Sequence, residues 1–484
     1  MSTNTLKQKI VSGFAWQSAT KLIIQLFSWT TTILVARILA PEDYGIVAIQ
    51  GIFTVTIGMV VDMGVSRGLI QKDSVTEQEI DSLFYFSLLM GVTAFSLYYL
   101  VAPVIAGFYQ IPELVDILRV AGLTFIFGSL KSVPVAITMR EMDFKYRSLV
   151  ELGGAFVNAG SLLVMAIYGF GVWALILSNL LAYLATTVAY FPIMKRIPKP
   201  RLVIREITGV ISFGFKVMLT GVMFSSYMKA DIFFLGKIGG DKLTGFYSMA
   251  IQLATIPLDK IGTIFNEITF PAMSRIQNDK KEAKLIFLKM HEYLLTVSLP
   301  LLIGLFFVAE DFVLILLGEK WSPAIAPLKV FALINVLRLS GMIMIPVLQG
   351  FGHPNKVLRY SGWCLALLPA AFMWGASYGI MGVMLAWAFA YPLVYCYLTI
   401  EALKVLEISW RDFLMSSSRP IVCVAIMGLF LLFFYTYYIP IWAVELRFLV
   451  AVSIGIFAYV LSYFLLYPRQ FAELTAGLKQ LKKS

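Results

Sequence analysis

The chain has 484 residues, of which 59% are hydrophobic and 14% are charged, and its formal net charge at pH 7 is +11. The mean hydropathy of +0.83 excludes an ordinary soluble domain, because soluble domains are only about half apolar. The positive charge alone would allow a nucleic-acid-binding protein. The basic residues, however, gather on one side of the predicted membrane spans, so no nucleic-acid partner is expected.

Long apolar stretches follow one another along the chain and are separated by short loops. A helix needs about 20 apolar residues to cross the hydrocarbon of a bilayer, which is roughly 30 Å thick. The sequence therefore predicts an all-α polytopic membrane protein with about fourteen transmembrane helices. The predicted spans are 11–36, 44–70, 80–107, 113–139, 147–168, 172–194, 207–235, 243–271, 289–317, 324–350, 356–377, 380–403, 412–437 and 442–467.

The basic residues are divided unevenly between the two sides of these spans. Of 39 Lys and Arg, 24 lie in the termini, in the loops after even-numbered spans or in the first residues of the spans that follow, and five lie in or just beyond the loops after odd-numbered spans. Cytoplasmic loops carry the excess of Lys and Arg in membrane proteins. Both termini are therefore predicted to be cytoplasmic, and the net charge is a signal of topology.

Two landmarks recur about 200 residues apart, which indicates an internal repeat. Residues 36–45 return as 236–245, and residues 168–172 return as 378–383. The charged linker 195–201 contains two prolines and cannot continue a helix, so it reads as a boundary. The predicted organisation is an N-lobe of helices 1–6 (1–198), a C-lobe of helices 7–12 (199–404), and helices 13–14 with a cytoplasmic tail (405–484). Two similar halves are a common build for secondary transporters, with the substrate site between them.

Polar residues follow one face of the first two helices in each predicted lobe, at helical spacings of three, four or seven. Such residues are costly inside a membrane, so stripes in matching positions predict a hydrated cavity. In the first lobe the stripes are Gln17, Lys21, Gln25, Ser28 and Thr32, and Gln50, Thr54, Gly58, Asp62 and Ser66. In the second they are Lys216, Thr220, Tyr227 and Asp231, with Ser225 and Lys229 beside them, and Gln252, Thr255, Asp259, Thr263 and Asn266, with Lys260 and Glu267 beside them.

These stripes supply the candidate site residues. Lysines in a wet cavity would attract an anion such as a phosphate group. The candidate substrate-binding residues are Gln17, Lys21, Gln25, Lys216, Lys229, Gln252, Lys260 and Asn266, and the candidate ion-coupling residues are Asp62, Asp231, Asp259 and Glu267. Two simpler interpretations stay open: Lys216 and Lys229 could extend to the membrane surface, and the carboxylates could only neutralise nearby lysines.

No catalytic or metal-binding pattern accompanies the stripes. The three cysteines, Cys364, Cys396 and Cys423, fall in different spans without metal-ligand spacing and are interpreted as packing residues. A phosphate-cradling glycine-rich loop is also lacking from the sequence. We expect no enzymatic activity, no metal and no cofactor.

Several motifs resemble a known family. Residues 36–48, with the sequence ARILAPEDYGIVA, resemble the A-R-x-L-x-P-x-D-[YF]-G loop of bacterial polysaccharide flippases. Residues 62–66 with 69–71, the block 134–147 and the stretch 169–175 match as well. Together they resemble the colanic-acid and teichuronic-acid exporter branch of the Wzx-type flippases, within the multidrug/oligosaccharidyl-lipid/polysaccharide exporter superfamily.

This resemblance implies a two-lobed fold of fourteen helices in the bacterial inner membrane. It also implies flipping of undecaprenyl-diphosphate-linked oligosaccharide units from the cytoplasmic to the outer leaflet, with membrane lipids and polysaccharide polymerase machinery as further partners. In related flippases cavity cations face the diphosphate, and Lys21, Lys216 and Lys260 fit that role here.

Two other functions compete with this interpretation. A membrane-embedded glycan polymerase or ligase would need a large outer loop with catalytic Arg or His, whereas the only histidines, His291 and His353, lie near predicted cytoplasmic ends. A cation-coupled drug antiporter of the same superfamily would need an acidic site such as Asp62, Asp231 or Asp259, but the lysines of the predicted cavity argue against it.

Overall fold

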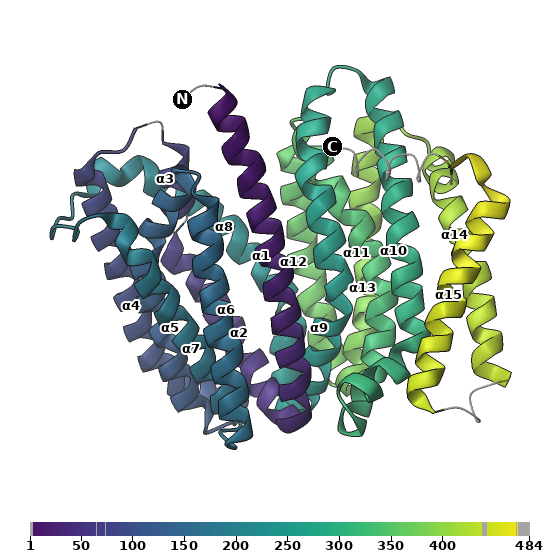
Figure 1. The fold of residues 1–484 in the computed structure, drawn as a ribbon, viewed down its shortest axis with the longest axis horizontal. Coiled ribbons are helices and arrows are strands. Elements are labelled where there is room, and N and C mark those ends of the chain that lie inside the picture. The colour runs from purple at the N-terminus through teal and green to yellow at the C-terminus, as the bar shows by residue number, and fades with distance from the viewer. Residues whose placement is uncertain (1–2, 64, 73, 438–442, 471, 473–484) are drawn as a thin grey trace. The chain divides into compact units, whose positions relative to one another are not determined.

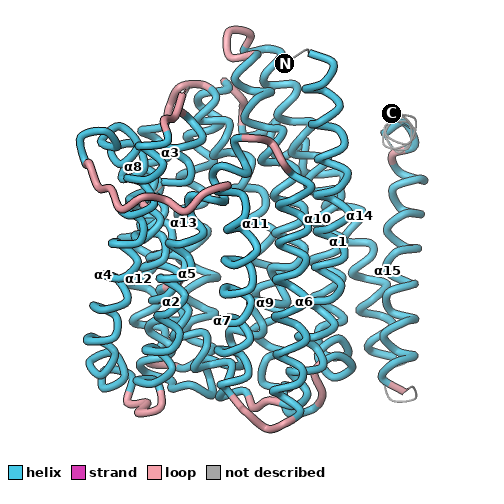
Figure 2. The backbone as a smooth tube through the Cα atoms, turned by 60° about the vertical axis from the view of Figure 1, so that its left-hand side comes forward, coloured by secondary structure: helices cyan, strands magenta, loops and turns pink. Residues whose placement is uncertain are grey.

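The computed structural model describes residues 3–63, 65–72, 74–437, 443–470 and 472. The described chain consists of α-helices, two short 3-10 helices and connecting loops (Figures 1 and 2). The helices are α1 (Thr3–Ile38), α2 (Pro41–Asp62), α3 (Val65–Gln71), α4 (Glu77–Tyr109), α5 (Leu114–Arg140), α6 (Phe144–Ile167), α7 (Val172–Tyr190), η1 (Phe191–Met194), α8 (Ile204–Met228), α9 (Ala230–Arg275), α10 (Lys280–Leu316), η2 (Glu319–Ala324), α11 (Ile325–Gly350), α12 (Pro354–Ala376), α13 (Gly379–Leu406), α14 (Trp410–Tyr437) and α15 (Val444–Leu466).

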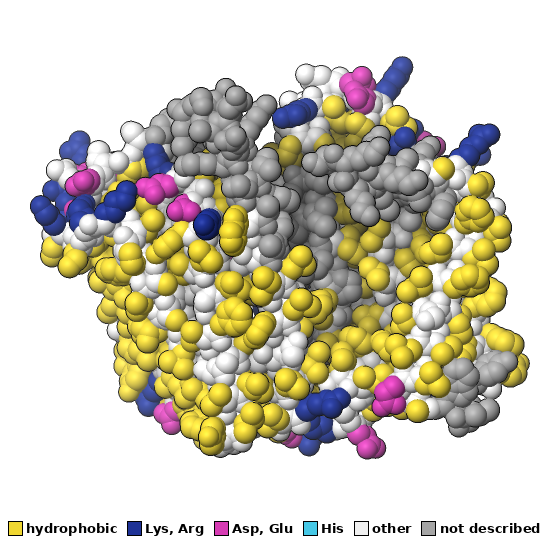
Figure 3. Space-filling view, viewed as in Figure 1, with side chains coloured by type: hydrophobic (Ala, Val, Ile, Leu, Met, Phe, Trp, Pro, Cys, Tyr) yellow, Lys and Arg dark blue, Asp and Glu magenta, His cyan; other side chains and the backbone are white. Residues whose placement is uncertain are grey.

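Thirteen helices of the described chain are long and apolar enough to cross a membrane. In the face drawn in Figure 3, hydrophobic side chains cover the middle of the helices, and many of the charged side chains lie near helix ends. The prediction of an all-α polytopic membrane protein is confirmed. The predicted span 243–271 corresponds to the second part of α9, which is not among the thirteen.

Two predicted spans are interrupted in the structure. The span predicted over 44–70 ends at Asp62, where Met63 adopts a left-handed conformation with φ 38°, and α3 then begins at Val65. The span predicted over 207–235 ends at Met228, with Lys229 as the residue that follows the helix. Apolar residues lie on both sides of each break, so the average hydropathy of a long window does not detect it, although Asp62 and Lys229 mark the two positions.

The chain divides into two compact units, Met1–Gly245 and Phe246–Ser484. The first contains α1–α8 and the beginning of α9, and in it α8 packs on α2, α3 and α4. The second contains the rest of α9 and α10–α15, in which α10 packs on α11, α14 and α15. The lobe boundaries predicted near residues 198 and 404 stay predictions.

The two copies of the repeated landmark contact each other inside the first unit. A Cβ atom on Gly45 would lie 1.8 Å from the carbonyl oxygen of Asp241, and one on Gly245 would lie 1.8 Å from the carbonyl oxygen of Pro41. The ammonium of Lys242 lies 3.0 Å from a carboxylate oxygen of Glu42 at the same crossing. The start of α2 and the first part of α9 therefore pack backbone against backbone, which only glycine permits.

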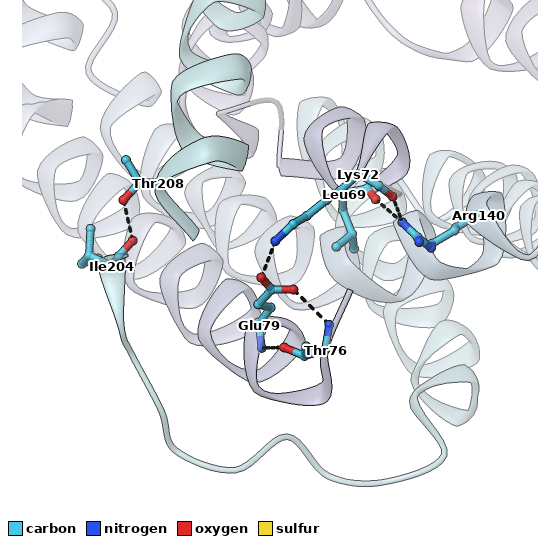
Figure 4. A network of polar contacts seen from close by, with 7 residues as sticks. All are labelled: Leu69, Lys72, Thr76, Glu79, Arg140, Ile204 and Thr208. Carbon is cyan, nitrogen blue, oxygen red and sulfur yellow. Dashed lines mark hydrogen bonds and ion pairs between the residues drawn. The ribbon is translucent and has the colours of Figure 1, made fainter. Parts of the chain in front are cut away.

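A polar network ties the segment between α3 and α4 to the end of α5 (Figure 4). Lys72 pairs with Glu79, whose second carboxylate oxygen accepts from the backbone N–H of Thr76 at 2.9 Å. The Arg140 guanidinium donates to the carbonyl of Leu69 at 3.0 Å and to that of Lys72. Arg140 belongs to the sequence block 134–147, so this part of the motif fixes the backbone at the end of α3, at Leu69 and Lys72.

Candidate functional site

A polar pocket of about 450 Å³ lies among four helices of the first unit. α1, α5, α6 and α7 each contribute side chains to it, and Ser28 and Thr32 of the predicted α1 stripe are among them. The polar and ionisable residues in its lining are Ser28, Thr31, Thr32, Lys131, Glu151, Asn158, Asn179, Tyr183 and Thr186.

Lys131 is the cation of this pocket. It lies 9 residues before the end of α5 at Arg140, which corresponds to about 14 Å along the helix axis. Its ammonium lies 3.9 Å from the centroid of the Tyr183 ring and donates to the hydroxyl of Thr186 at 3.3 Å. No carboxylate of the described residues lies within 4.0 Å of it. Two groups from α7 therefore hold an ammonium that lacks a direct counter-ion.

The carboxylate of Glu151 is engaged by a different cation. Arg147, one turn earlier on α6, donates from Nε to Glu151 Oε1 at 2.7 Å. Charges at this spacing on a helix face each other. Glu151 lines the same pocket as Lys131, and with Arg147 beside it these three charged groups carry a net charge of +1.

The predicted residues of α1 beyond the pocket face more open surroundings. Lys21 is exposed, and Gln17 and Gln25 are half-buried. Within the described residues none of the three side chains makes a hydrogen bond or an ion pair. Their accessibility is compatible with the predicted cavity, and their role stays a prediction.

The polar residues of α2 are bonded within the first unit. Gln50 donates to Thr54, whose hydroxyl lies 3.3 Å from that of Tyr98. Asp62 accepts from Ser66 at 3.0 Å and from Ser132 at 3.1 Å. In the described chain the partners of Asp62 are thus serines, and no lysine or arginine lies within ion-pair distance. The ion-coupling role of Asp62 stays a prediction.

The predicted residues on α8 and α9 are spread over different environments. Lys216 and Gln252 are exposed, Lys229 is half-buried, and Asp231 is buried. An oxygen of Asp231 accepts from the backbone N–H of Ile232 at 2.7 Å, within the first turn of α9. The predicted side chains of Asp259, Lys260, Asn266 and Glu267 lie outside those that the structure describes. The proposed roles of all eight residues stay predictions.

A second cation inside a span lies in the second unit. Arg338 is 13 residues after the start of α11 at Ile325 and 12 before its end at Gly350. Its guanidinium lies 5.4 Å from the centroid of the Trp387 ring on α13 and donates to Asn335 at 3.2 Å. Within the described residues no carboxylate lies within 4.0 Å of it.

The neighbours of Arg338 form a rigid frame. Asn335 donates to the carbonyl of Ala254 at 2.8 Å, which ties α11 to α9. The indole N–H of Trp387 donates to the hydroxyl of Tyr247 at 3.0 Å, and the Trp387 ring packs against Phe331 and Phe372. A guanidinium held in this way resembles Lys131 in the first unit, because each cation lies over an aromatic ring of another helix.

Sequence reasoning missed both Lys131 and Arg338. Each lies in the apolar middle of its span, away from the charges near the span's start, and neither belongs to a periodic stripe. A simple search for every Lys and Arg inside a predicted span would have found them, because charges at such depth are costly and commonly functional. Their aromatic partners lie on other helices and could not be paired from sequence.

A comparison with models of protein families shows which family the chain belongs to. Residues 34–326 match the family described as polysaccharide biosynthesis protein, and this range covers more than half of the chain. The chain belongs to that family. The resemblance found in the motifs of the first lobe is thereby confirmed.

Relatives cover most of the chain. The teichuronic acid biosynthesis protein TuaB of Bacillus subtilis is 26% identical over 479 residues, which are 97% of this chain and 98% of that protein. The lipopolysaccharide biosynthesis protein WzxC of Escherichia coli is 23% identical over 79% of this chain and 78% of its own length. The succinoglycan biosynthesis transport protein ExoT of Rhizobium meliloti is 22% identical over 88% of this chain and 87% of its own.

Solved structures share the fold. The lipid II flippase MurJ in an inward closed conformation superposes with a TM-score of 0.75 at 15% identity, over 93% of this chain and 98% of that one. An inward-facing multidrug resistance transporter of the MATE family gives a TM-score of 0.58 at 16% identity, over 85% of this chain and 98% of the other. This family member therefore has the fold of the exporter superfamily.

Proposed function

We propose that the protein is a flippase for lipid-linked oligosaccharides. It moves undecaprenyl-diphosphate-linked units from the cytoplasmic to the outer leaflet during the biosynthesis of a bacterial capsule, exopolysaccharide or O-antigen. Family membership is the observation that carries this proposal. The names of its relatives, which concern teichuronic acid, lipopolysaccharide and succinoglycan, support a role in surface polysaccharides.

The charged groups inside the spans fit such a cargo. A lipid-linked oligosaccharide has a polar, anionic head that must cross the membrane, and the second unit offers Arg338, a cation without a direct counter-ion among the described residues. An anion gains most from a cation where water is scarce, because the effective dielectric constant is low there. The protein acts as a transporter in this proposal and catalyses no bond change.

The expected place of action is the bacterial inner membrane, with both termini in the cytoplasm. A reporter that is active only outside the membrane should give a signal when fused after residues 170, 240 and 320, and no signal after residues 200 and 280. The physical reason is the 24-to-five division of basic residues between the two sets of loops. The opposite pattern of signals would reverse the topology and with it the direction of transport.

The central test is transport by the purified full-length protein in proteoliposomes that contain undecaprenyl-diphosphate oligosaccharide. Arg338→Gln, Lys21→Gln and Lys216→Gln are each expected to lower the flipping rate, with the largest loss, about tenfold or more, for Arg338. Lys→Arg at positions 21 and 216 should be tolerated better, since a positive potential is the main requirement. Wild-type rates in all three Gln variants would contradict an anion-binding role for these residues.

Alternating access is the expected mechanism, with candidate ion coupling through Asp62, Asp231, Asp259 or Glu267. With the proposed topology, the glycine crossing of Gly45 and Gly245 lies at the outer end of the helices. Flipping that ignores both pH and sodium gradients would remove ion coupling and leave the flippase proposal intact.

A drug antiporter is the second candidate, favoured by the likeness of the fold to a multidrug transporter. The two functions separate in one experiment. An antiporter would confer resistance to organic cations and extrude them, whereas the flippase is expected to restore surface polysaccharide in a strain that lacks its own exporter. Drug resistance without restored polysaccharide would favour the antiporter.

A further inference from the structure

The pocket around Lys131 has the composition of a carbohydrate site. Its polar lining combines two amides, Asn158 and Asn179, with the hydroxyls of Ser28, Thr31 and Thr32. Sugars are bound by such a mixture of donors and acceptors, because each sugar hydroxyl both donates and accepts. The volume of about 450 Å³ falls in the range of roughly 300–1,000 Å³ that is usual for small-molecule sites.

These lining groups are available to a ligand. Within the described residues the side chains of Asn158, Asn179, Ser28, Thr31 and Thr32 make no hydrogen bond to the protein. By contrast, Thr186 of the same pocket bonds to the backbone of the preceding turn, at the carbonyl of Ala182 at 2.9 Å. Unpaired polar groups are costly in membrane-spanning segments unless water or a ligand satisfies them.

The charge of the pocket selects the kind of sugar. Lys131 contributes one positive charge, and the negative charge of Glu151 is matched by Arg147 at 2.7 Å. The Tyr183 ring and the Thr186 hydroxyl hold the ammonium from α7, so its remaining donors are free for a ligand. One uncompensated ammonium matches one carboxylate, whereas a diphosphate carries more charge than this pocket could balance.

We propose that this pocket binds an acidic sugar residue of the carried oligosaccharide. The sugar carboxylate, such as that of a uronate, receives hydrogen bonds from the Lys131 ammonium, and its ring hydroxyls bond to Asn158 and Asn179. Tyr183 and Thr186 are positioning residues, since they hold the ammonium and do not touch the sugar. This inference rests on the proposed function, and it adds a preference among glycans.

Transport of two matched substrates tests the preference. The two lipid-linked oligosaccharides share the same undecaprenyl diphosphate and differ in one sugar, which carries a carboxylate in one and a hydroxymethyl group in the other. Lys131→Gln is expected to lower flipping of the acidic substrate about tenfold and to leave the neutral one unchanged. Lys131→Arg should retain most of the preference, and Lys281→Gln, at the exposed start of α10, serves as the matched control.

Equal loss for both substrates in Lys131→Gln would assign the lysine to the shared diphosphate or to folding, and would overturn the proposal. An unchanged rate for the acidic substrate would overturn it as well. Asn179→Ala provides an independent variant, because its side chain is exposed and its loss leaves the charge of the pocket intact. It is expected to slow the acidic substrate by a smaller factor than Lys131→Gln.

Binding of simple sugars separates this inference from the proposed function. Saturation-transfer NMR of the purified full-length protein in nanodiscs compares methyl glucuronide with methyl glucoside. A stronger signal from the glucuronide that disappears in Lys131→Gln supports the site, even when the protein flips neither lipid-linked substrate, and in that case only the proposed function fails. Equal signals from the two sugars in the wild-type protein would overturn the acidic-sugar site.

Discussion

Alanine in place of Gly45 or Gly245 is expected to abolish most glycan export and to lower the thermal stability of the purified protein. Each added methyl group would lie 1.8 Å from a backbone carbonyl oxygen, of Asp241 or of Pro41. A backbone cannot move aside as a flexible side chain can, so the two segments must separate. Overpacking of this kind costs about 3 kcal/mol or more. The midpoint of thermal unfolding in detergent and the amount of surface polysaccharide measure the two effects.

Gly51→Ala is the matched control on the same helix. Nothing lies within 4 Å of a Cβ atom at Gly51, which is inside α2. Because alanine is favoured over glycine within a helix by about 1 kcal/mol, this variant should be as stable as the wild type or slightly more stable. If Gly45→Ala and Gly245→Ala matched Gly51→Ala in stability and export, the backbone contact between α2 and α9 would have no importance.

The sequence predicted the membrane spans where apolar runs end at polar loops. The span predicted over 113–139 corresponds to α5, Leu114–Arg140, and the span predicted over 147–168 to α6, Phe144–Ile167. The span prediction failed at Met63 and Lys229, where the backbone leaves the helix although long apolar segments lie on both sides. Left-handed or irregular conformations at single residues depend on tertiary contacts, which hydropathy does not record.

The repeat detected in the sequence was more informative than its length suggests. The copies at 36–45 and 236–245 were recognised as similar loops. In the structure Gly45 packs against the backbone of Asp241, and Gly245 packs against the backbone of Pro41. Glycine at both positions follows from this contact, since small residues allow close approach of helices in membranes. The contact itself could not be inferred, because repeat copies can equally lie far apart.

The candidate site could be predicted only in part. Helical periodicity found Ser28 and Thr32 on one face of α1, and both line the polar pocket of the first unit. Periodicity could not find Lys131, whose environment depends on Tyr183 and Thr186 of α7, or Arg338, which depends on Trp387 of α13. Residues that gain their role from another helix need the tertiary structure to be recognised.

Breaking the buried ion pair of Asp311 and Arg447 is expected to destabilise the second unit strongly. Asp311 on α10 is fully buried, and its carboxylate accepts from Arg447 Nε of α15 at 2.7 Å and from the hydroxyl of Tyr435 of α14 at 2.7 Å. This network joins three helices. Arg447→Met would leave the carboxylate buried beside a single donor, and removal of one partner from a buried pair costs about 3–5 kcal/mol.

Two further variants separate the ion pair from ordinary surface electrostatics. Lys284→Gln breaks the ion pair with Asp412. The side chains of Lys284 and Asp412 are 36% and 38% exposed, so the expected cost is only about 0–1 kcal/mol. The double variant Asp311→Leu with Arg447→Met removes both charges and should recover much of the stability lost in Arg447→Met, because no unpaired carboxylate remains buried. Thermal unfolding of the full-length protein measures all three. An Arg447→Met variant no less stable than Lys284→Gln would mean that packing alone, without this ion pair, holds α14 and α15 against α10.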